Sequence, residues 1–147
     1  MNRKILNYTV FHGGYTESHS KIRLMQLNNI THDILDSAYK VHSVLGPGLL
    51  ESAYQACLVY ELTKKGLKVE VEKPLPLIYE EIRLECGYRI DILVENKVVV
   101  ELKTVESFTD VHTAQVLTYL KLSGCKVGLL INFYTKSLKN GIKRLVL

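Results

Sequence analysis

The stretch that decides the fold of this chain is Arg89-Ile-Asp-Ile-Leu-Val-Glu-Asn-Lys-Val-Val-Val-Glu-Leu-Lys103. Its composition predicts two apolar strands joined by a short turn, with Asp91, Glu101 and Lys103 set into the strands. A carboxylate within a run of β-branched residues is costly unless it has a partner or a metal ion. Two carboxylates and a lysine brought together across one hairpin therefore suggest a site for a divalent cation and a polarised water. That is the chemistry of phosphodiester hydrolysis.

The alternation of side chains along a strand predicts which residues share a face of this hairpin. The polar face is expected to carry Asp91, Glu101 and Lys103 beside Leu93 and Val99. The opposite face is expected to be wholly apolar, with Ile90, Ile92, Val94, Val98, Val100 and Leu102.

The length of the turn fixes the register, because directly opposed residues of an antiparallel pair lie on the same face. Asp91 can oppose Glu101 only if the turn has an odd number of residues, for example Glu95-Asn96-Lys97. A two-residue turn would put Asp91 opposite Val100 or Leu102. The apolar pattern and the proposed site demand the same register. The alternative is a solvated sheet face on which Glu101 and the neighbouring lysine form a weak ion pair.

Length and composition indicate one ordinary globular domain. The chain has 147 residues, of which 47% are hydrophobic and 23% charged, enough for a real core. No run reaches the ~18 apolar residues of a membrane span, so no membrane association is expected. Basic residues near the N-terminus are not followed by an apolar segment, so secretion is not expected either. Three cysteines without Cys-x-x-Cys spacing, Cys57, Cys86 and Cys125, predict reduced thiols in a cytoplasmic protein.

The charge distribution is more informative than the net charge of +4. Acidic residues concentrate between Glu70 and Glu106, around the proposed site, and none follows Asp110. The basic residues after Asp110 are Lys121, Lys126, Lys136, Lys139, Lys143 and Arg144. A carboxylate cluster beside a basic segment suits a metal ion plus a polyanion. The alternative is a solubilising surface.

Periodicity and turn residues predict the other elements. Residues 1–26 lack clean periodicity and are expected to form a loose arm or an added strand, with His12 and His19 solvated rather than bound to metal. Residues 27–147 are expected to form the domain. Its first helix carries the stripe Ile30, Ile34, Ala38, Val41 and Leu45, with Asn29 or Thr31 as the cap. The later expected elements are a helix over 49–65 with Gly66 at C′, strands over 68–79, 82–94 and 97–103, a helix over 109–122, a strand over 126–133, and a tight Asn140-Gly141 turn before a short last strand.

Several motifs in order resemble one known family. Gly48-Leu-Leu-Glu51-Ser-Ala-Tyr54 is similar to the motif that names the GxxExxY family, within the PD-(D/E)XK nuclease superfamily. The further matching stretches are 41–48, 87–91, 101–103, 115–119, 129–133 and 141–144. Ile90 stands where the superfamily motif has its nominal proline. The resemblance implies an α/β, restriction-endonuclease-like core: a mixed central sheet, made of an antiparallel meander plus a crossover helix, flanked by helices.

The resemblance also implies roles for individual residues. Asp91 and Glu101 would be metal-binding carboxylates, with the Leu102 carbonyl as a third ligand, and the cation would be Mg²⁺ or Mn²⁺. Lys103 would orient the nucleophilic water and stabilise developing charge. Gln115 and Tyr119 resemble the Gln-x-x-x-Tyr motif of RecB-type nucleases and would contact the site or the nucleic-acid backbone.

Glu51 resembles the additional helix-borne acidic residue of many superfamily members. Its alternative role is at N3 of the second helix, where a carboxylate favours the macrodipole. Tyr54 is expected in the core, and His42 is expected to be a hydrogen-bonded packing residue. For His112 a polar role near the site is left open.

Two function classes follow. The first is a metal-dependent nuclease acting on DNA or RNA, and the second is a non-catalytic nucleic-acid-binding or assembly module that kept the fold. Retention of Asp91, Glu101 and Lys103 together favours the nuclease. Lys121, Lys143 and Arg144, with Tyr119, are the expected nucleic-acid contacts. A homodimer is one alternative for the oligomeric state.

Overall fold

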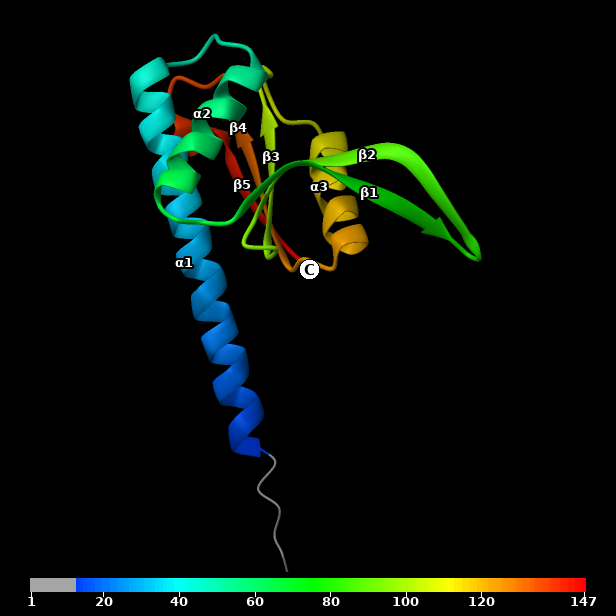
Figure 1. The fold of residues 1–147 in the computed structure, drawn as a ribbon. Helices are drawn as coiled ribbons and strands as arrows, with labels where there is room; N and C mark the ends of the chain where they lie inside the picture. The colour runs from blue at the N-terminus through cyan, green and yellow to red at the C-terminus, as the bar shows by residue number, and fades with distance from the viewer. Residues whose placement is uncertain (1–12) are drawn as a thin grey trace, which may run out of the picture.

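A five-stranded mixed sheet organises the chain, with the strands side by side in the order β1-β2-β3-β4-β5 (Figure 1). The computed structural model describes residues 13–147. The strands are β1 (Val69–Tyr79), β2 (Ile82–Val94), β3 (Val98–Lys103), β4 (Val127–Asn132) and β5 (Ile142–Val146). Neighbouring strands are antiparallel except β3 and β4, which are parallel. The predicted meander and crossover are therefore confirmed.

Helices cover both faces of this sheet. Helices α1 (Gly13–Leu45) and α2 (Glu51–Lys64) pack on one face, where they share a core with β3 residues Val98, Val100 and Leu102. Helix α3 (Asp110–Ser123) makes the crossover between β3 and β4 and packs on the opposite face. The apolar face of the β2–β3 hairpin therefore lies against α1 and α2, and Glu101 lies on the face that α3 covers.

One predicted apolar position lies on the other side of the sheet. Ile90 packs in the cluster under α3, with Leu75 and Leu93, rather than with Ile92 and Val94. The pairing of β2 with β3 ends at Ile92. Beyond that point β2 pairs only with β1, so it is free to twist away from the plane that the alternation rule assumes.

The first helix begins much earlier than its apolar stripe suggests. Residues 13–26, expected as a loose arm or strand, are helical and continue without a break into the predicted helix. Asn29 and Thr31 therefore lie inside α1 and cap nothing, and the Thr31 hydroxyl donates to the Asn28 carbonyl at 2.9 Å. Residues 17–26 are exposed along this extension. Good helix formers such as Lys, Arg, Met and Gln, with no proline, let an existing helix propagate where it buries no side chains in the core. His12 lies outside the described residues.

The remaining α-helices and strands differ from expectation only at their ends, whereas one expected turn has a different structure. Gly66 follows the last turn of α2 with φ +80°, the left-handed conformation of a C′ glycine. Strand β1, which contains Pro74 and Pro76, is at the sheet edge as predicted. The expected Asn140-Gly141 turn is instead part of a short 3₁₀ helix, η1 (Leu138–Gly141), in the connection between β4 and β5. No helix of residues 13–147 is long and apolar enough to span a bilayer.

Candidate active site

The register of β2 and β3 brings the two predicted carboxylates together. Ile92 pairs with Val100 and Val94 with Val98, across a three-residue turn at 95–97. One further step along the same register sets Asp91 opposite Glu101, so the odd-numbered turn is confirmed. The ladder itself ends at Ile92 and Val100, and beyond it the Asp91 carboxylate accepts a hydrogen bond from the Leu102 backbone N–H at 2.8 Å. Asp91 is thus fixed against β3 by a backbone donor.

Glu101 is a buried carboxylate with only one of its two oxygens satisfied. Its residue exposure is 2%. Oε1 accepts a hydrogen bond from the Lys103 ammonium at 2.8 Å, whereas Oε2 is buried and has no hydrogen-bond partner among the described residues. A buried polar oxygen without a partner carries a desolvation cost. The Oε2 atom of Glu101 is therefore available as a hydrogen-bond acceptor or metal ligand next to Asp91.

Burial and charge shift the titration of all three hairpin groups. Burial, with the neighbouring charge of Asp91, raises the pKa of Glu101 to about 7. Burial also raises the pKa of Asp91, although the Leu102 N–H and the charge of Lys103 act in the opposite direction. Burial lowers the pKa of Lys103, but the hydrogen bond and charge of Glu101, with the charges of Asp91 and Glu51, outweigh it and leave this pKa raised.

Helix α2 contributes a third acidic side chain to this charged group. Glu51 is the first residue of α2, after Leu50 at the N-cap, so it is at N1 rather than at N3. Burial raises the pKa of Glu51, and the charges of Lys103 and Asp91 act on it in opposite directions. Glu51 is therefore close enough to the hairpin to interact electrostatically with Lys103 and Asp91. Its N-terminal position on α2 also favours a carboxylate, because of the helix macrodipole.

Gln55, one turn after Glu51, is a site residue that the sequence reasoning missed. Its side-chain amide donates to the Asp91 backbone carbonyl at 3.4 Å. The available signal was its spacing, since residues four apart lie on the same helix face. A glutamine on a half-buried helix is too common to single out without knowing that α2 packs against β2.

Helix α3 brings its predicted pair together. The Gln115 amide donates to the Tyr119 hydroxyl at 3.0 Å. Burial raises the pKa of Tyr119, the Gln115 hydrogen bond lowers it, and the charges of Glu101 and Asp91 raise it. Tyr119 is only 4% exposed, so its predicted contact with nucleic acid would need its neighbours to move. His112 belongs to the helix start instead, where its Nδ1 accepts from the Thr109 N–H at 3.1 Å.

Lys143 lies on the same sheet face as the carboxylates. It pairs with Leu130, which in turn pairs with Glu101, so one cross-strand row runs from Glu101 to Lys143. Two strand spacings separate the ends of this row by roughly 10 Å. The Lys143 ammonium is 5.5 Å from the centre of the Phe108 ring.

The structure does not bring the other two predicted basic contacts to this row. Arg144, the next residue of β5, pairs with Leu129 on the α1 side of the sheet and donates to the Asn28 side chain at 3.1 Å. Lys121 is exposed on α3, six residues after Gln115, which is roughly 120° away around the helix.

Two residues near the site have packing roles, as predicted. Tyr54 is fully buried and stacks on Phe133 with ring centres 4.5 Å apart. Its hydroxyl donates to the Gly46 carbonyl at 2.6 Å and accepts from the Leu49 N–H at 3.1 Å. The His42 ring donates to the Thr135 carbonyl at 2.7 Å.

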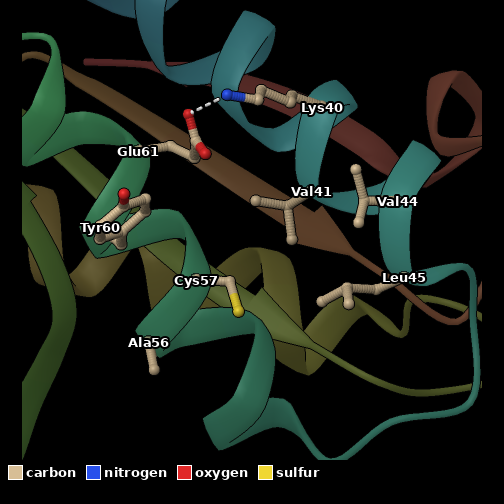
Figure 2. A pocket seen from close by; sticks show the side chains of 8 residues that line it. All are labelled: Lys40, Val41, Val44, Leu45, Ala56, Cys57, Tyr60 and Glu61. Atoms are coloured by element: carbon tan, nitrogen blue, oxygen red, sulfur yellow. Dashed lines mark hydrogen bonds and ion pairs between the residues drawn. The ribbon is translucent and has the colours of Figure 1, made fainter.

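An apolar pocket of ≈ 280 Å³ lies elsewhere, between α1 and α2 (Figure 2). Val41, Val44, Leu45 and Cys57 line it, and an ion pair of 2.7 Å between Lys40 and Glu61 crosses its rim. None of the predicted site residues lines this pocket. The chemistry of the chain is therefore concentrated at the hairpin and not in this pocket.

The hairpin carboxylates fit a hard divalent cation. Mg²⁺ is usually bound by one or two carboxylates together with waters and phosphate oxygens. The Asp91 carboxylate and the Glu101 carboxylate, whose Oε2 has no hydrogen-bond partner in the part of the chain that the structure describes, supply such a sparse donor set. No group of three His, Cys, Asp or Glu side chains that could hold a metal is found in residues 13–147, so Glu51 does not complete a three-residue metal-binding group with Asp91 and Glu101.

Comparison with known proteins agrees with this geometry. Residues 28–145 match the PD-(D/E)XK nuclease superfamily. The chain belongs to that superfamily. Its mixed five-stranded sheet with helices on both faces is the restriction-endonuclease-like fold, and membership supports a nuclease-type function. No curated protein and no solved structure matches the chain.

Proposed function

We propose that this superfamily member is a metal-dependent nuclease that hydrolyses phosphodiester bonds of DNA or RNA. The observation that carries the proposal is the unpartnered Glu101 Oε2, buried beside Asp91 and next to the Lys103 ammonium. A buried carboxylate pair without a cation is destabilising by mutual repulsion. A bound cation relieves that repulsion and gives Oε2 a partner.

Asp91, Glu101 and the Leu102 carbonyl are the proposed ligands of Mg²⁺ or Mn²⁺. When bound, the cation would supply a water of lowered pKa and neutralise charge on the scissile phosphate. The chain's own contribution is to hold the two carboxylates in place. The Leu102 N–H fixes Asp91, and Gln55 holds the Asp91 backbone from α2.

Lys103 is the proposed catalytic cation. Its raised pKa keeps it protonated, so it can donate a hydrogen bond to the attacking water and stabilise negative charge that develops on the phosphate. Glu51 is proposed as an additional acidic residue of the site, and Gln115 as a side chain that orients the substrate. Tyr119 would then hold Gln115 in position.

The Gly48 to Tyr54 motif explains how Glu51 reaches this site, and supports placing the chain in the GxxExxY family. Gly48 has φ +104°, a conformation that side chains disfavour. Tyr54 anchors the preceding loop through its bonds to Gly46 and Leu49. The glycine and the tyrosine thus shape the entrance to α2, whereas the charge of Glu51 acts on Lys103 and Asp91.

The direct test is cleavage of mixed DNA and RNA substrates by the Asp91→Asn variant. We expect no detectable cleavage with Mg²⁺ or Mn²⁺, because one ligand is lost. Nucleic-acid affinity should stay within about threefold, since only one negative charge is removed among many contacts. Gel assays of cleavage and anisotropy titrations of binding measure the two effects separately.

Glu106→Gln is the matched control, because Glu106 is an exposed carboxylate in the loop after β3. It should cleave like the parent protein. If neither the parent nor the control cleaves any substrate with either metal while both still bind nucleic acid, the non-catalytic binding module replaces the nuclease.

A further inference from the structure

The loop after β4 presents two exposed side chains at a pocket that the proposed catalytic residues leave unused. The pocket has a volume of ≈ 390 Å³ and is lined by Pro47, Gly48, Tyr134 and Lys136. Tyr134 is 49% exposed, and Lys136 is exposed as well. The volume falls within the range of small-ligand sites. Its lining offers a flat aromatic ring, a cation and no acidic residue.

This pocket adjoins the proposed active site on two sides. The Phe133 N–H, directly before Tyr134, donates to the Lys103 carbonyl at 2.9 Å. On the other side, Gly48 precedes Glu51 by three residues in the loop that Tyr54 anchors. The segments that line the pocket are thus continuous with those that carry Lys103 and Glu51, so a polymer that binds at the hairpin carboxylates can extend toward it.

The backbone that carries Tyr134 and Lys136 is held in place. The Tyr134 N–H donates to the buried Asn132 side chain at 3.1 Å, and the Thr135 hydroxyl donates to the Asn132 carbonyl at 3.3 Å. His42 of α1 donates to the Thr135 carbonyl. Because the loop is already ordered, a ligand that binds its side chains has little backbone entropy to remove.

We propose that this pocket binds one nucleotide of the substrate, with its base stacked on Tyr134 and a phosphate near Lys136. An aromatic ring with a neighbouring cation is the usual platform for single strands, since every base has a flat face. A base inside a duplex already stacks on its neighbours on both faces. The substrate class is therefore single-stranded or locally unpaired nucleic acid, a conclusion that rests on the proposed nuclease function.

Binding of a short single-stranded oligonucleotide, measured by anisotropy in EDTA, tests the stacking. EDTA removes any cleavage, so the readout does not depend on activity. Tyr134→Ala should weaken binding about 5- to 150-fold, which corresponds to the usual loss of one stacked base. Tyr134→Phe should bind within about twofold of the parent, because it keeps the ring. Tyr60→Ala is the control, since Tyr60 is a comparably exposed tyrosine at the α1–α2 pocket.

The salt dependence of the same titration tests the phosphate contact. Lys136→Gln should flatten the slope of log K against log salt by about 0.7, the value for one phosphate contact on a single strand. Lys126→Gln is the matched control, because Lys126 precedes β4 at the opposite end of that strand. It should leave the slope unchanged.

The outcomes separate this inference from the proposed function. If Tyr134→Ala weakens oligonucleotide binding and Tyr134→Phe keeps the affinity of the parent, the proposed nucleotide pocket is supported even if no cleavage is ever found. Equal affinities of Tyr134→Ala and the parent overturn it, even if the enzyme cleaves with metal. It is also overturned if Tyr134→Phe binds as poorly as Tyr134→Ala, or if a duplex of the same sequence binds as tightly as the single strand.

Discussion

The Glu101 carboxyl group links the protonation of this protein to its stability. Its pKa is raised from 4.5 to about 7, mainly by burial. Between these two values the folded chain keeps a proton that the unfolded chain releases. In the cation-free protein, the contribution of Glu101 to the free energy of unfolding is therefore fully present below pH 4.5. This contribution is lost as the pH rises through about 7.

Glu101→Gln should remove that dependence, because an amide of the same shape does not ionise. We expect the melting temperature of the parent, relative to the variant, to fall between pH 5 and pH 8 when both are measured in EDTA. Mn²⁺ should raise the melting temperature of the parent at pH 8 and not that of the variant. Glu106→Gln, at an exposed site, serves as the control. A constant difference between parent and Glu101→Gln across this range would contradict the account.

The central residues of the site could be predicted from sequence because they follow the period of a strand. Asp91, Glu101 and Lys103 share a face once the turn length is set, and both the pattern and the structure require three turn residues. The residues that hold these three side chains and the next loop in place could not be predicted from the sequence. Gln55 reaches Asp91 only through the packing of α2 on β2, and Asn132 holds the next loop through backbone bonds.

At the scale of elements, β5 places the basic residues of the C-terminal segment on two opposite faces of the sheet. Lys143 lies in the cross-strand row of Glu101, and Arg144 lies on the α1 side. The sequence reasoning treated the two as one contact surface, although adjacent residues of a strand point to opposite faces. The predicted short strand already contained the information that separates them.

Lys143→Gln and Arg144→Gln should therefore behave differently. We expect Lys143→Gln to flatten the slope of log K against log salt by about 0.7 to 0.9, because one phosphate contact is lost. Arg144→Gln should leave the slope unchanged. Neither variant should alter the metal requirement or discriminate between sequences, since phosphate contacts carry no base identity. An unchanged slope for Lys143→Gln would show that Lys143 makes no phosphate contact, and a flattened slope for Arg144→Gln would contradict the assignment of contacts to the α3 side alone.

The contact between α3 and β4 depends on the absence of a side chain at Gly128. A Cβ added there would lie 2.6 Å from Cγ1 of Val116, which is fully buried on α3. A β-branched residue in a helix has little rotamer freedom to move away. Gly128→Ala should therefore cost about 1–3 kcal/mol of unfolding free energy, measured by urea denaturation.

The double variant Gly128→Ala, Val116→Ala tests the cause of this loss. Removing the Val116 methyl groups makes room for the new Cβ, so the two changes together should cost less than the sum of the single changes. Additive costs would mean that the destabilisation by Gly128→Ala does not arise from this contact.

Helix α1 shows where periodicity fails as a guide to an element. Its packed half carries the predicted stripe, in which Ile34 and Ala38 are fully buried. Its other half is exposed, with Ile22 and Met25 at 54% and 65% exposure. A helix segment that buries no apolar side chains in the core has no reason to segregate them on one face, so the sequence pattern marks only the half of α1 that packs on the sheet.

At the scale of the whole molecule, the site is assembled where several elements meet. In the proposed site, helix α2 would contribute Glu51, the β2–β3 hairpin would contribute Asp91, Glu101 and Lys103, and α3 would contribute Gln115. The helices reach the hairpin from the two opposite faces of the sheet (Figure 1). The parallel β3–α3–β4 crossover fixes this arrangement.

The central claim is that this meeting point hydrolyses phosphodiester bonds with a divalent cation and Lys103. The most direct measurement is the cleavage rate of a mixed DNA and RNA substrate set, with Mg²⁺, Mn²⁺ or EDTA, by the parent, Lys103→Ala and Lys126→Ala. We predict cleavage by the parent and Lys126→Ala with metal, none in EDTA, and a loss of at least about a hundredfold in Lys103→Ala. Equal rates for Lys103→Ala and the parent, or cleavage that persists in EDTA, would contradict the account.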